Sequence, residues 1–195
     1  LDALLGLANV VLLTEGVAAG RAVLDAAPAA MRELPRYWLA LGAMNAQAGA
    51  LAEAAQAYQA AVDKTAEKPA KLERMMALGG LAEAQMRLGK VAEADATSAA
   101  LLKLAPDHPL AKQLRGQVAA AGGKFDEARS LLEEVVSAQP NNPDALLLLG
   151  FVNLQQGNLD QAEMHFQSVV VRDPGNARAQ RLLAEVRARQ ESPAK

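Results

Sequence analysis

The chain has 195 residues, of which 51% are apolar and 22% are charged, so it is not a disordered, solvated segment and it can bury a core. A net charge of -2 and an aromatic content of 3% exclude the basic excess and the stacking rings that a nucleic-acid partner requires. The absence of cysteine excludes disulfides, thiolate metal sites and a cysteine nucleophile.

The most apolar window, residues 4–13, has about half of the roughly 20 residues that a membrane span requires. No basic segment precedes it, so the window does not resemble a signal peptide. We therefore expect no direct membrane insertion by this segment. Because Leu1 is not an initiator Met, we interpret the chain as a piece of a longer repeat protein.

Small and apolar residues recur along the chain with a period of 34 residues, at places 4, 7, 8, 15, 20, 24, 27 and 32 of each unit. The abundance of Ala favours helices, and a period of this length is typical of stacked helix pairs. Small residues occupy places 8 and 20, such as Gly150 and Ala162. We expect these two places to meet where the helices of a pair approach closely.

The first unit, 1–34, fits the pattern least well, because Glu15 and Arg32 stand at the places of Gly and Pro. The second unit, 35–68, keeps the register and is followed by six additional residues, 69–74. We expect this insertion to lengthen the first helix of the next unit by nearly two turns, about 9 Å. A longer surface loop is the alternative.

Three units in register follow, each with Gly at place 15 and Pro at place 32: 75–108, 109–142 and 143–176. Asn142 before Pro143 predicts an N-cap and a helix start, and Gly157 predicts a left-handed helix end. The segment 177–190 is similar to the first helix of a sixth unit and is expected to cap the array, with 191–195 as a tail.

These places and residues resemble the tetratricopeptide repeat (TPR). The resemblance implies an all-α fold, a right-handed superhelical solenoid of antiparallel helix pairs with five repeats and a C-terminal capping helix, in one array over 1–195. It also implies that first helices line a concave groove through places 2, 5, 9, 12 and 13. The candidate groove residues are Leu5, Asn9, Arg36, Leu39, Ala43, Gln47, Met76, Glu83, Met86, Arg87, Gln113, Gln117, Asp144, Leu147, Phe151 and Gln155.

A mixed apolar and amide lining suits an extended peptide or a partner helix, so the predicted function is a protein-interaction scaffold. The alternative for Phe151, Leu147 and Met86 is packing between repeats. Some TPR domains bind a C-terminal carboxylate through a clamp of Lys, Asn and Arg, but only Asn9 matches that clamp here. A chaperone-tail receptor is therefore not expected, and the oligomeric state stays open.

Catalysis has no candidate residues in the sequence. His108 and His165 lie in different units, and neither has a metal-ligand partner at helical spacing. No nucleotide-binding glycine loop or nucleophile elbow is present. We expect no enzyme activity, no metal and no cofactor.

The last three units carry the segments GKFDEARSLLEEVV and NARAQRLLAEVRAR. Over residues 105–187 the chain resembles TPR lipoproteins of bacterial PEP-CTERM, exopolysaccharide-associated systems. That resemblance implies a periplasmic or envelope-associated scaffold for protein or exopolysaccharide export and assembly. Two alternatives are a regulatory or substrate-positioning region of a larger enzyme, such as a glycosyltransferase, and a cytoplasmic adaptor.

Overall fold

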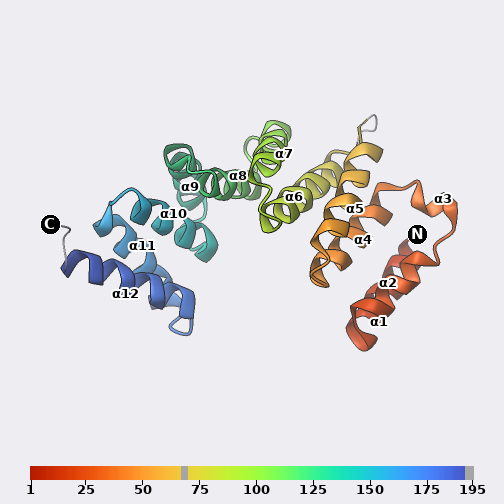
Figure 1. Ribbon diagram of the computed structural model, residues 1–195, viewed down its shortest axis with the longest axis horizontal. Helices are drawn as coiled ribbons and strands as arrows, with labels where there is room; N and C mark the ends of the chain where they lie inside the picture. Colours follow the sequence, from red (N-terminus) through yellow and green to blue (C-terminus); the bar gives the residue numbers. More distant parts are fainter. Residues whose placement is uncertain (67–69, 192–195) are drawn as a thin grey trace. The chain divides into compact units, whose positions relative to one another are not determined.

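The computed structural model describes residues 1–66 and 70–191. Within these ranges the chain forms twelve α-helices and no strand, which confirms the predicted all-α class (Figure 1). The helices belong to two compact units, Leu1–Pro106 and Asp107–Lys195, where the sequence predicts one array. The division falls in the turn that separates the third predicted repeat from the fourth. Because a repeat packs mainly against its neighbours, a stack can divide into compact sets of repeats.

The first unit is a stack of helix pairs. It contains α1 (Asp2–Glu15), α2 (Val17–Asp25), α3 (Ala29–Arg32), α4 (Pro35–Gln47), α5 (Leu51–Lys64), α6 (Lys71–Arg87) and α7 (Val91–Leu104). Helices α1 and α2, α4 and α5, and α6 and α7 pack as pairs, and α4 also contacts α6. The first helices α4 and α6 therefore lie side by side.

The second unit repeats this arrangement. It contains α8 (Pro109–Ala121), α9 (Phe125–Ala138), α10 (Pro143–Gln155), α11 (Leu159–Arg172) and α12 (Ala177–Glu191). The first helices α8, α10 and α12 contact one another in sequence, while α9 and α11 pack against them. Each unit is thus a short helical solenoid with one face formed by first helices.

Glycine in the left-handed conformation makes the turn inside a helix pair. Gly157 has a φ of 79°, as the sequence predicts, and follows α10 where the chain reverses into α11. The first pair has Glu15 at this place, and the turn moves one residue along the chain to Gly16, with a φ of 94°. The departure from the repeat pattern is therefore compensated locally.

The first pair has a shorter second helix than the others. Helix α2 has 9 residues, and the side chain of Arg32 donates hydrogen bonds to the carbonyl oxygens of Asp25 (2.6 Å) and Ala27 (3.2 Å) near its end. A guanidinium in this position satisfies carbonyl groups that the helix leaves without partners. Arg32, which stands at a place usually held by Pro, thus stabilises the end of α2.

The start of α10 follows the predicted capping pattern. The side chain of Asn142 accepts a hydrogen bond from the backbone N–H of Ala145 at 3.0 Å, and Pro143 occupies the first helical position. Asparagine in this position satisfies one of the amide groups left free at a helix start. The predicted N-cap is confirmed.

Helix α6 is longer than the other first helices, but by less than the sequence predicts. It has 17 residues where α4 has 13, a difference of one turn and not nearly two. Ala70, which precedes the helix, has a φ of -104° and a ψ of 56°, so the helical conformation begins only at Lys71. The rest of the 69–74 insertion, Pro69, lies outside the described residues.

Helices of a pair approach closely where a place-8 glycine faces a place-24 side chain. A Cβ atom on Gly150 would lie 2.5 Å from Cε1 of Phe166, and one on Gly42 would lie 2.8 Å from Cδ1 of Tyr58. The three atoms nearest to the Gly150 Cβ position all belong to Phe166, and the expected approach of Gly150 to Ala162 stays a prediction. Ala162 is fully buried, but the ring of Phe166 is the group that requires glycine at place 8.

In two other pairs the close approach involves places 8 and 20, and a Cβ atom on Gly116 would lie 3.4 Å from the carbonyl oxygen of Ala128. A Cβ atom on Gly20 would lie 2.9 Å from the carbonyl oxygen of Ala8. Such a distance to backbone cannot be relieved by a side-chain rotation. Gly20 therefore sets the separation between α1 and α2.

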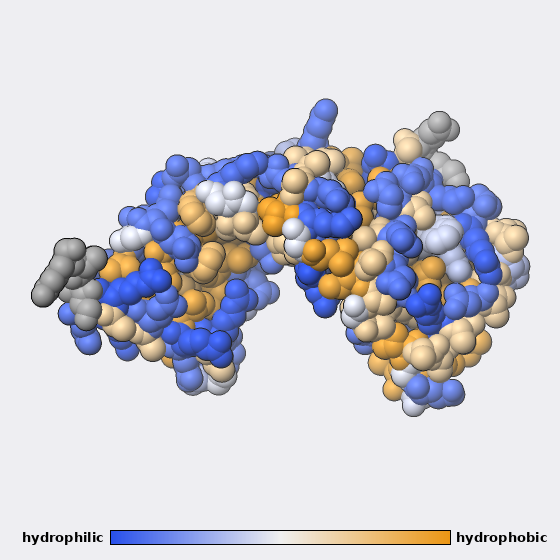
Figure 2. All heavy atoms as spheres, viewed as in Figure 1, coloured by the Kyte–Doolittle hydropathy of each residue, from blue (hydrophilic) through white to orange (hydrophobic). Residues whose placement is uncertain are grey.

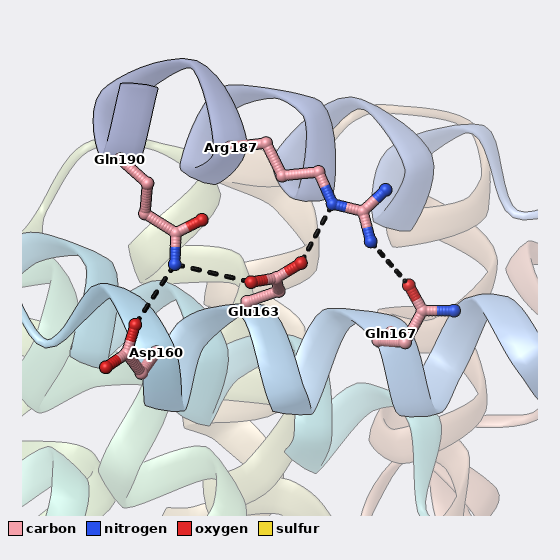
Figure 3. Close-up of polar contacts among 5 residues, drawn as sticks. All are labelled: Asp160, Glu163, Gln167, Arg187 and Gln190. Carbon is pink, nitrogen blue, oxygen red and sulfur yellow. Dashed lines mark hydrogen bonds and ion pairs between the residues drawn. The ribbon is translucent and has the colours of Figure 1, made fainter. Parts of the chain in front are cut away.

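Helix α12 occupies the segment predicted as a cap and contacts α11 through both apolar and polar side chains. Ala179, Leu183 and Val186 are buried in a core that also contains Phe166 and Val169 of α11. Figure 3 shows the polar contacts above this core, which join Arg187 and Gln190 to side chains of α11. One face of α12 is therefore buried against α11, while its opposite face is polar.

Glu163 is the centre of these polar contacts. Its carboxylate accepts hydrogen bonds from Arg187 Nε at 2.8 Å and from Gln190 Nε2 at 3.3 Å (Figure 3). The hydrogen bond from Arg187, followed by that from Gln190, lowers the pKa of Glu163 below its ordinary value of 4.5. Since the folded state has the lower pKa, this contribution to stability is present above pH 4.5 and is lost as the pH falls through the folded-state pKa.

We therefore expect Arg187→Gln to lower the urea midpoint of unfolding at neutral pH. The decrease in the midpoint should become smaller when the pH is lowered below 4.5. Arg189→Gln is the matched control, because the ion pair of Arg189 is with Glu185 within α12. The measurement is urea unfolding followed by circular dichroism across this pH range. A difference between Arg187→Gln and wild type that stays constant with pH would contradict the assignment.

Candidate functional site

All the candidate groove residues lie on first helices, and a subset of them surrounds one hollow in the first unit. This hollow has a volume of about 440 Å³ and is lined by Leu5, Arg36, Leu39, Ala40, Ala43, Leu72, Glu73 and Met76. Leu5, Arg36, Leu39, Ala43 and Met76 belong to the predicted set, and they come from α1, α4 and α6. We call this feature the α1/α4/α6 hollow.

The α1/α4/α6 hollow has an apolar lining with a buried floor and exposed walls. Leu39 is only 8% exposed and also packs with Ala61 and Ala77 in the core, so it forms the floor. Leu72 and Met76 on α6 are 65% and 55% exposed. Large apolar side chains that stay exposed around a hollow are typical of a surface that binds another molecule.

Charged groups lie at one end of the hollow. Arg36 pairs with Asp2 at 2.8 Å, and both side chains are largely exposed, so the pair contributes little to stability. A second hollow of about 370 Å³ adjoins this end, and Arg36 and Glu73 border both. Among the described residues Glu73 has no ion-pair or hydrogen-bond partner for its side chain.

Sequence reasoning missed Leu72 and Glu73. Both lie in the extra turn of α6, which belongs to the 69–74 insertion and has no equivalent in the 34-residue unit. Groove residues were predicted from their places in the 34-residue unit, so residues of an insertion could not be included. The available signal was the insertion itself, because residues added at the start of a first helix extend the face on which groove residues lie.

The remaining candidates in the first unit lie on the same helices outside the α1/α4/α6 hollow. Asn9, Gln47, Glu83 and Arg87 are exposed, and Met86 is half-buried. Glu83 also affects the half-buried Tyr58: partial burial raises the pKa of the Tyr58 hydroxyl, and the Glu83 carboxylate raises it further.

In the second unit the candidate residues have mixed environments. Leu147 is 5% exposed and belongs to the core, and Phe151 packs against that core, so packing within the repeats accounts for both side chains. Leu147 is therefore corrected from a groove residue to a core residue. Gln113 is half-buried and accepts a hydrogen bond from Asn142 Nδ2 at 3.0 Å. Gln117 is half-buried, while Asp144 and Gln155 are exposed.

A larger hollow of about 480 Å³ lies between α5, α6 and the start of α7. It is lined mainly by alanines and amides, and its polar groups already interact with one another. Gln59 donates to Asp63 at 2.8 Å, and Lys90 pairs with Glu93 at 3.3 Å. Because it lacks exposed apolar anchors comparable to Leu72, we favour the α1/α4/α6 hollow despite its smaller volume.

Helix α1 has a further apolar surface, visible as the orange region over this helix in Figure 2. Leu7, Val10 and Leu13 are 54%, 56% and 76% exposed there. The two hollows that α1 lines, described above, do not include Leu7, Val10 or Leu13.

Within the described part of the chain, no group of three or more His, Cys, Asp and Glu residues could hold a metal ion. His165 is half-buried, and burial lowers its pKa, an effect that the Glu133 carboxylate opposes. Within the same residues no helix combines the length and apolarity needed to cross a membrane.

Paired helices stacked side by side, with a hollow across their first helices, define the chain as an α-helical repeat protein. Two family models, both described as tetratricopeptide repeat, match residues 80–143 and 119–186. Together these matches span more than half of the chain, which belongs to the tetratricopeptide repeat family. They give no support to the closer resemblance to envelope lipoproteins.

Solved TPR structures share this fold at low sequence identity. A TPR protein from Parabacteroides merdae has a TM-score of 0.77 and 19% identity, with 97% of this chain and 73% of that chain covered. YrrB, described as a TPR protein with an unusual peptide-binding site, has a TM-score of 0.70 and 17% identity, with 91% and 89% covered.

The first TPR of Spaghetti (RPAP3), solved with an HSP90 peptide, has a TM-score of 0.56 and 19% identity, and 60% of this chain and 94% of that chain are covered. No curated protein sequence matches the chain. The structural likenesses therefore establish the fold, and the ligands named belong to those proteins.

Proposed function

We propose that this chain is a non-catalytic scaffold that binds a peptide segment of a protein partner in the α1/α4/α6 hollow. The observation that carries the proposal is the convergence of predicted groove residues from α1, α4 and α6 around one apolar hollow. Two structures of similar fold are described with a peptide-binding site or a bound peptide, which supports a peptide as the ligand class.

The dimensions and chemistry of the hollow suit a few side chains of a peptide. Its volume of about 440 Å³ lies in the usual range for ligand sites, about 300–1,000 Å³. Leu39 offers a buried floor, and Leu72 and Met76 offer apolar walls that would lose contact with water on binding. A peptide would thus be anchored by apolar side chains, as amphipathic segments are in other helical grooves.

The proposal predicts position-specific capture of a partner. A photo-crosslinking residue at Met76 in the native host should trap a protein, and one at Met164 should not. Met164 is a matched control because it is the same residue type, is 51% exposed and lies on the second helix α11. The trapped segment would be identified by mass spectrometry.

A peptide made from the trapped segment should bind the purified chain, and Leu72→Asp should weaken that binding by at least tenfold, as loss of an apolar anchor does. Leu72 is 65% exposed, so this change should leave the fold intact, which circular dichroism would check. Equal capture from both positions, or a peptide that binds Leu72→Asp as tightly as wild type, would contradict the proposal.

We further propose that the scaffold acts in a bacterial cell envelope, in export or assembly of protein or exopolysaccharide. The sequence resemblance over residues 105–187 supports this role. A signal peptide that ends in a lipid-anchoring Cys in the complete reading frame would favour it. A catalytic domain in that reading frame would favour the alternative, a substrate-positioning region of a larger enzyme, and neither feature would favour a cytoplasmic adaptor.

A further inference from the structure

The extra turn of α6 places a carboxylate between two adjoining hollows. Glu73 lines the α1/α4/α6 hollow together with Leu72 and Met76 of the same helix. It also lines the adjoining hollow of about 370 Å³, which Asp2 and Arg36 border as well. A ligand that extends from one hollow into the other would pass this carboxylate.

The charges around the two hollows do not cancel. Asp2 and Arg36 neutralise one another in an ion pair of 2.8 Å. Glu73 is half-buried and has no counterpart among the described residues, so one negative charge is left over. A carboxylate at the edge of an apolar surface interacts with a ligand charge more strongly than a fully hydrated one, because less water screens it.

We propose that the segment bound in the α1/α4/α6 hollow carries a Lys or Arg next to an aliphatic side chain. This inference rests on the proposed function, whose ligand class it narrows. The aliphatic side chain occupies the space between Leu39, Leu72 and Met76, and the cation pairs with the Glu73 carboxylate. Charge complementarity of this kind gives selectivity among peptides that share the same apolar anchor.

An acidic segment fits the same site poorly. Its carboxylate would face Glu73, and Arg36, the cationic side chain among the described residues that line the two hollows, already pairs with Asp2. Like charges brought together at an interface disfavour the wrong partner. The extra turn of α6 is thus a selectivity element, present in this helix and absent from the 13-residue helices α4, α8 and α10.

The test uses a random peptide library displayed on phage and panned against the full chain. Enriched peptides should combine Leu, Ile or Met with a Lys or Arg a few residues away. We expect Glu73→Gln to raise the Kd of an enriched peptide roughly tenfold, and Glu73→Lys to raise it further, as loss of a charged partner at an interface does. Fluorescence anisotropy with the labelled peptide measures both values.

Glu53→Gln is the matched control, because it makes the same change in net charge at an exposed residue of α5 that borders none of the three hollows. Its Kd should equal that of the wild type. Enriched peptides that are neutral or acidic, or that bind Glu73→Lys as tightly as wild type, would overturn the inference.

Binding of the peptides to the Leu72 and Glu73 variants also distinguishes a failure of this inference from a failure of the proposed function. If binding is lost in Leu72→Asp but unchanged in both Glu73 variants, the hollow binds peptides and the charge preference is wrong. If no peptide is enriched, or the enriched peptides tolerate Leu72→Asp, both the binding site and the charge preference are overturned. Loss of binding in Leu72→Asp together with weaker binding in Glu73→Gln supports both.

Discussion

Replacement of Phe166 by Ala is expected to lower the free energy of unfolding of the second unit by about 3–5 kcal/mol. Phe166 is fully buried in a core formed by α10, α11 and α12. Its ring lies against Gly150, which has no side chain that could move into the space left behind. The cavity would therefore persist, and the loss would approach the lower end of the stability of small domains, which is about 5–15 kcal/mol.

Met164→Ala on the same helix is the control for this substitution. Met164 is 51% exposed, and surface substitutions away from special features usually change stability by less than about 0.5 kcal/mol. Urea unfolding of both variants, followed by circular dichroism, gives the two free energies. Similar losses in both would mean that α11 packs with another face toward the core.

Two neighbouring glycines of α6 should respond to Ala substitution with opposite signs. A Cβ atom on Gly80 would lie 2.4 Å from Cζ of Tyr58, whereas no atom outside the helix lies within 4 Å of one on Gly79. Gly79→Ala should raise stability by up to about 1 kcal/mol, because Ala has the higher helix propensity. Gly80→Ala gains the same propensity, but overpacking costs about 1–3 kcal/mol or more, so we expect a net loss.

The ring of Tyr58 cannot easily move away from a Cβ atom at position 80. Gly42 of α4 approaches the same ring, with a distance of 2.8 Å from its own Cβ position to Cδ1. The Tyr58 side chain is thus confined between the backbones of α4 and α6. A smaller side chain at position 58 should remove this collision. Gly80→Ala should therefore lower the free energy of unfolding less in a Tyr58→Leu background.

Thermal unfolding of Gly80→Ala, Tyr58→Leu and the double variant forms a double-mutant cycle. A positive coupling between positions 58 and 80 is the expected result, since the two residues are in direct contact. Equal stability of Gly79→Ala and Gly80→Ala would show that α5 does not press its ring against α6 at this point.

Much of the fold could be predicted from the sequence because turns and helix starts depend on residues that are close together in the chain. A left-handed turn requires glycine, and Gly157 adopts the expected conformation. The helix start at Asn142 also depends on neighbours in sequence. The contact between Gly150 and Phe166 could not be deduced in this way, because spacing identifies small residues and does not show which side chain on the facing helix fills the space.

The candidate site was predictable in part for the same reason. Places transferred from repeat to repeat located Leu39 and Met76 at one hollow. They differ from the structure at Leu147, whose place lines the groove in the pattern, whereas the packing of α10, α11 and α12 buries it. They could not include Glu73, because an inserted turn has no counterpart in other repeats.

The contact between place 8 and place 24 has a consequence for the design of such arrays, since the residue at place 8 limits the space for the side chain at place 24. Where place 8 is Gly, as at Gly150, place 24 holds the ring of Phe166. In the third repeat Ala82 stands at place 8 and Ser98 at place 24, and both are fully buried. The residues at places 8 and 24 of one repeat should therefore be changed together, because a larger side chain at place 8 alone would collide with the ring at place 24.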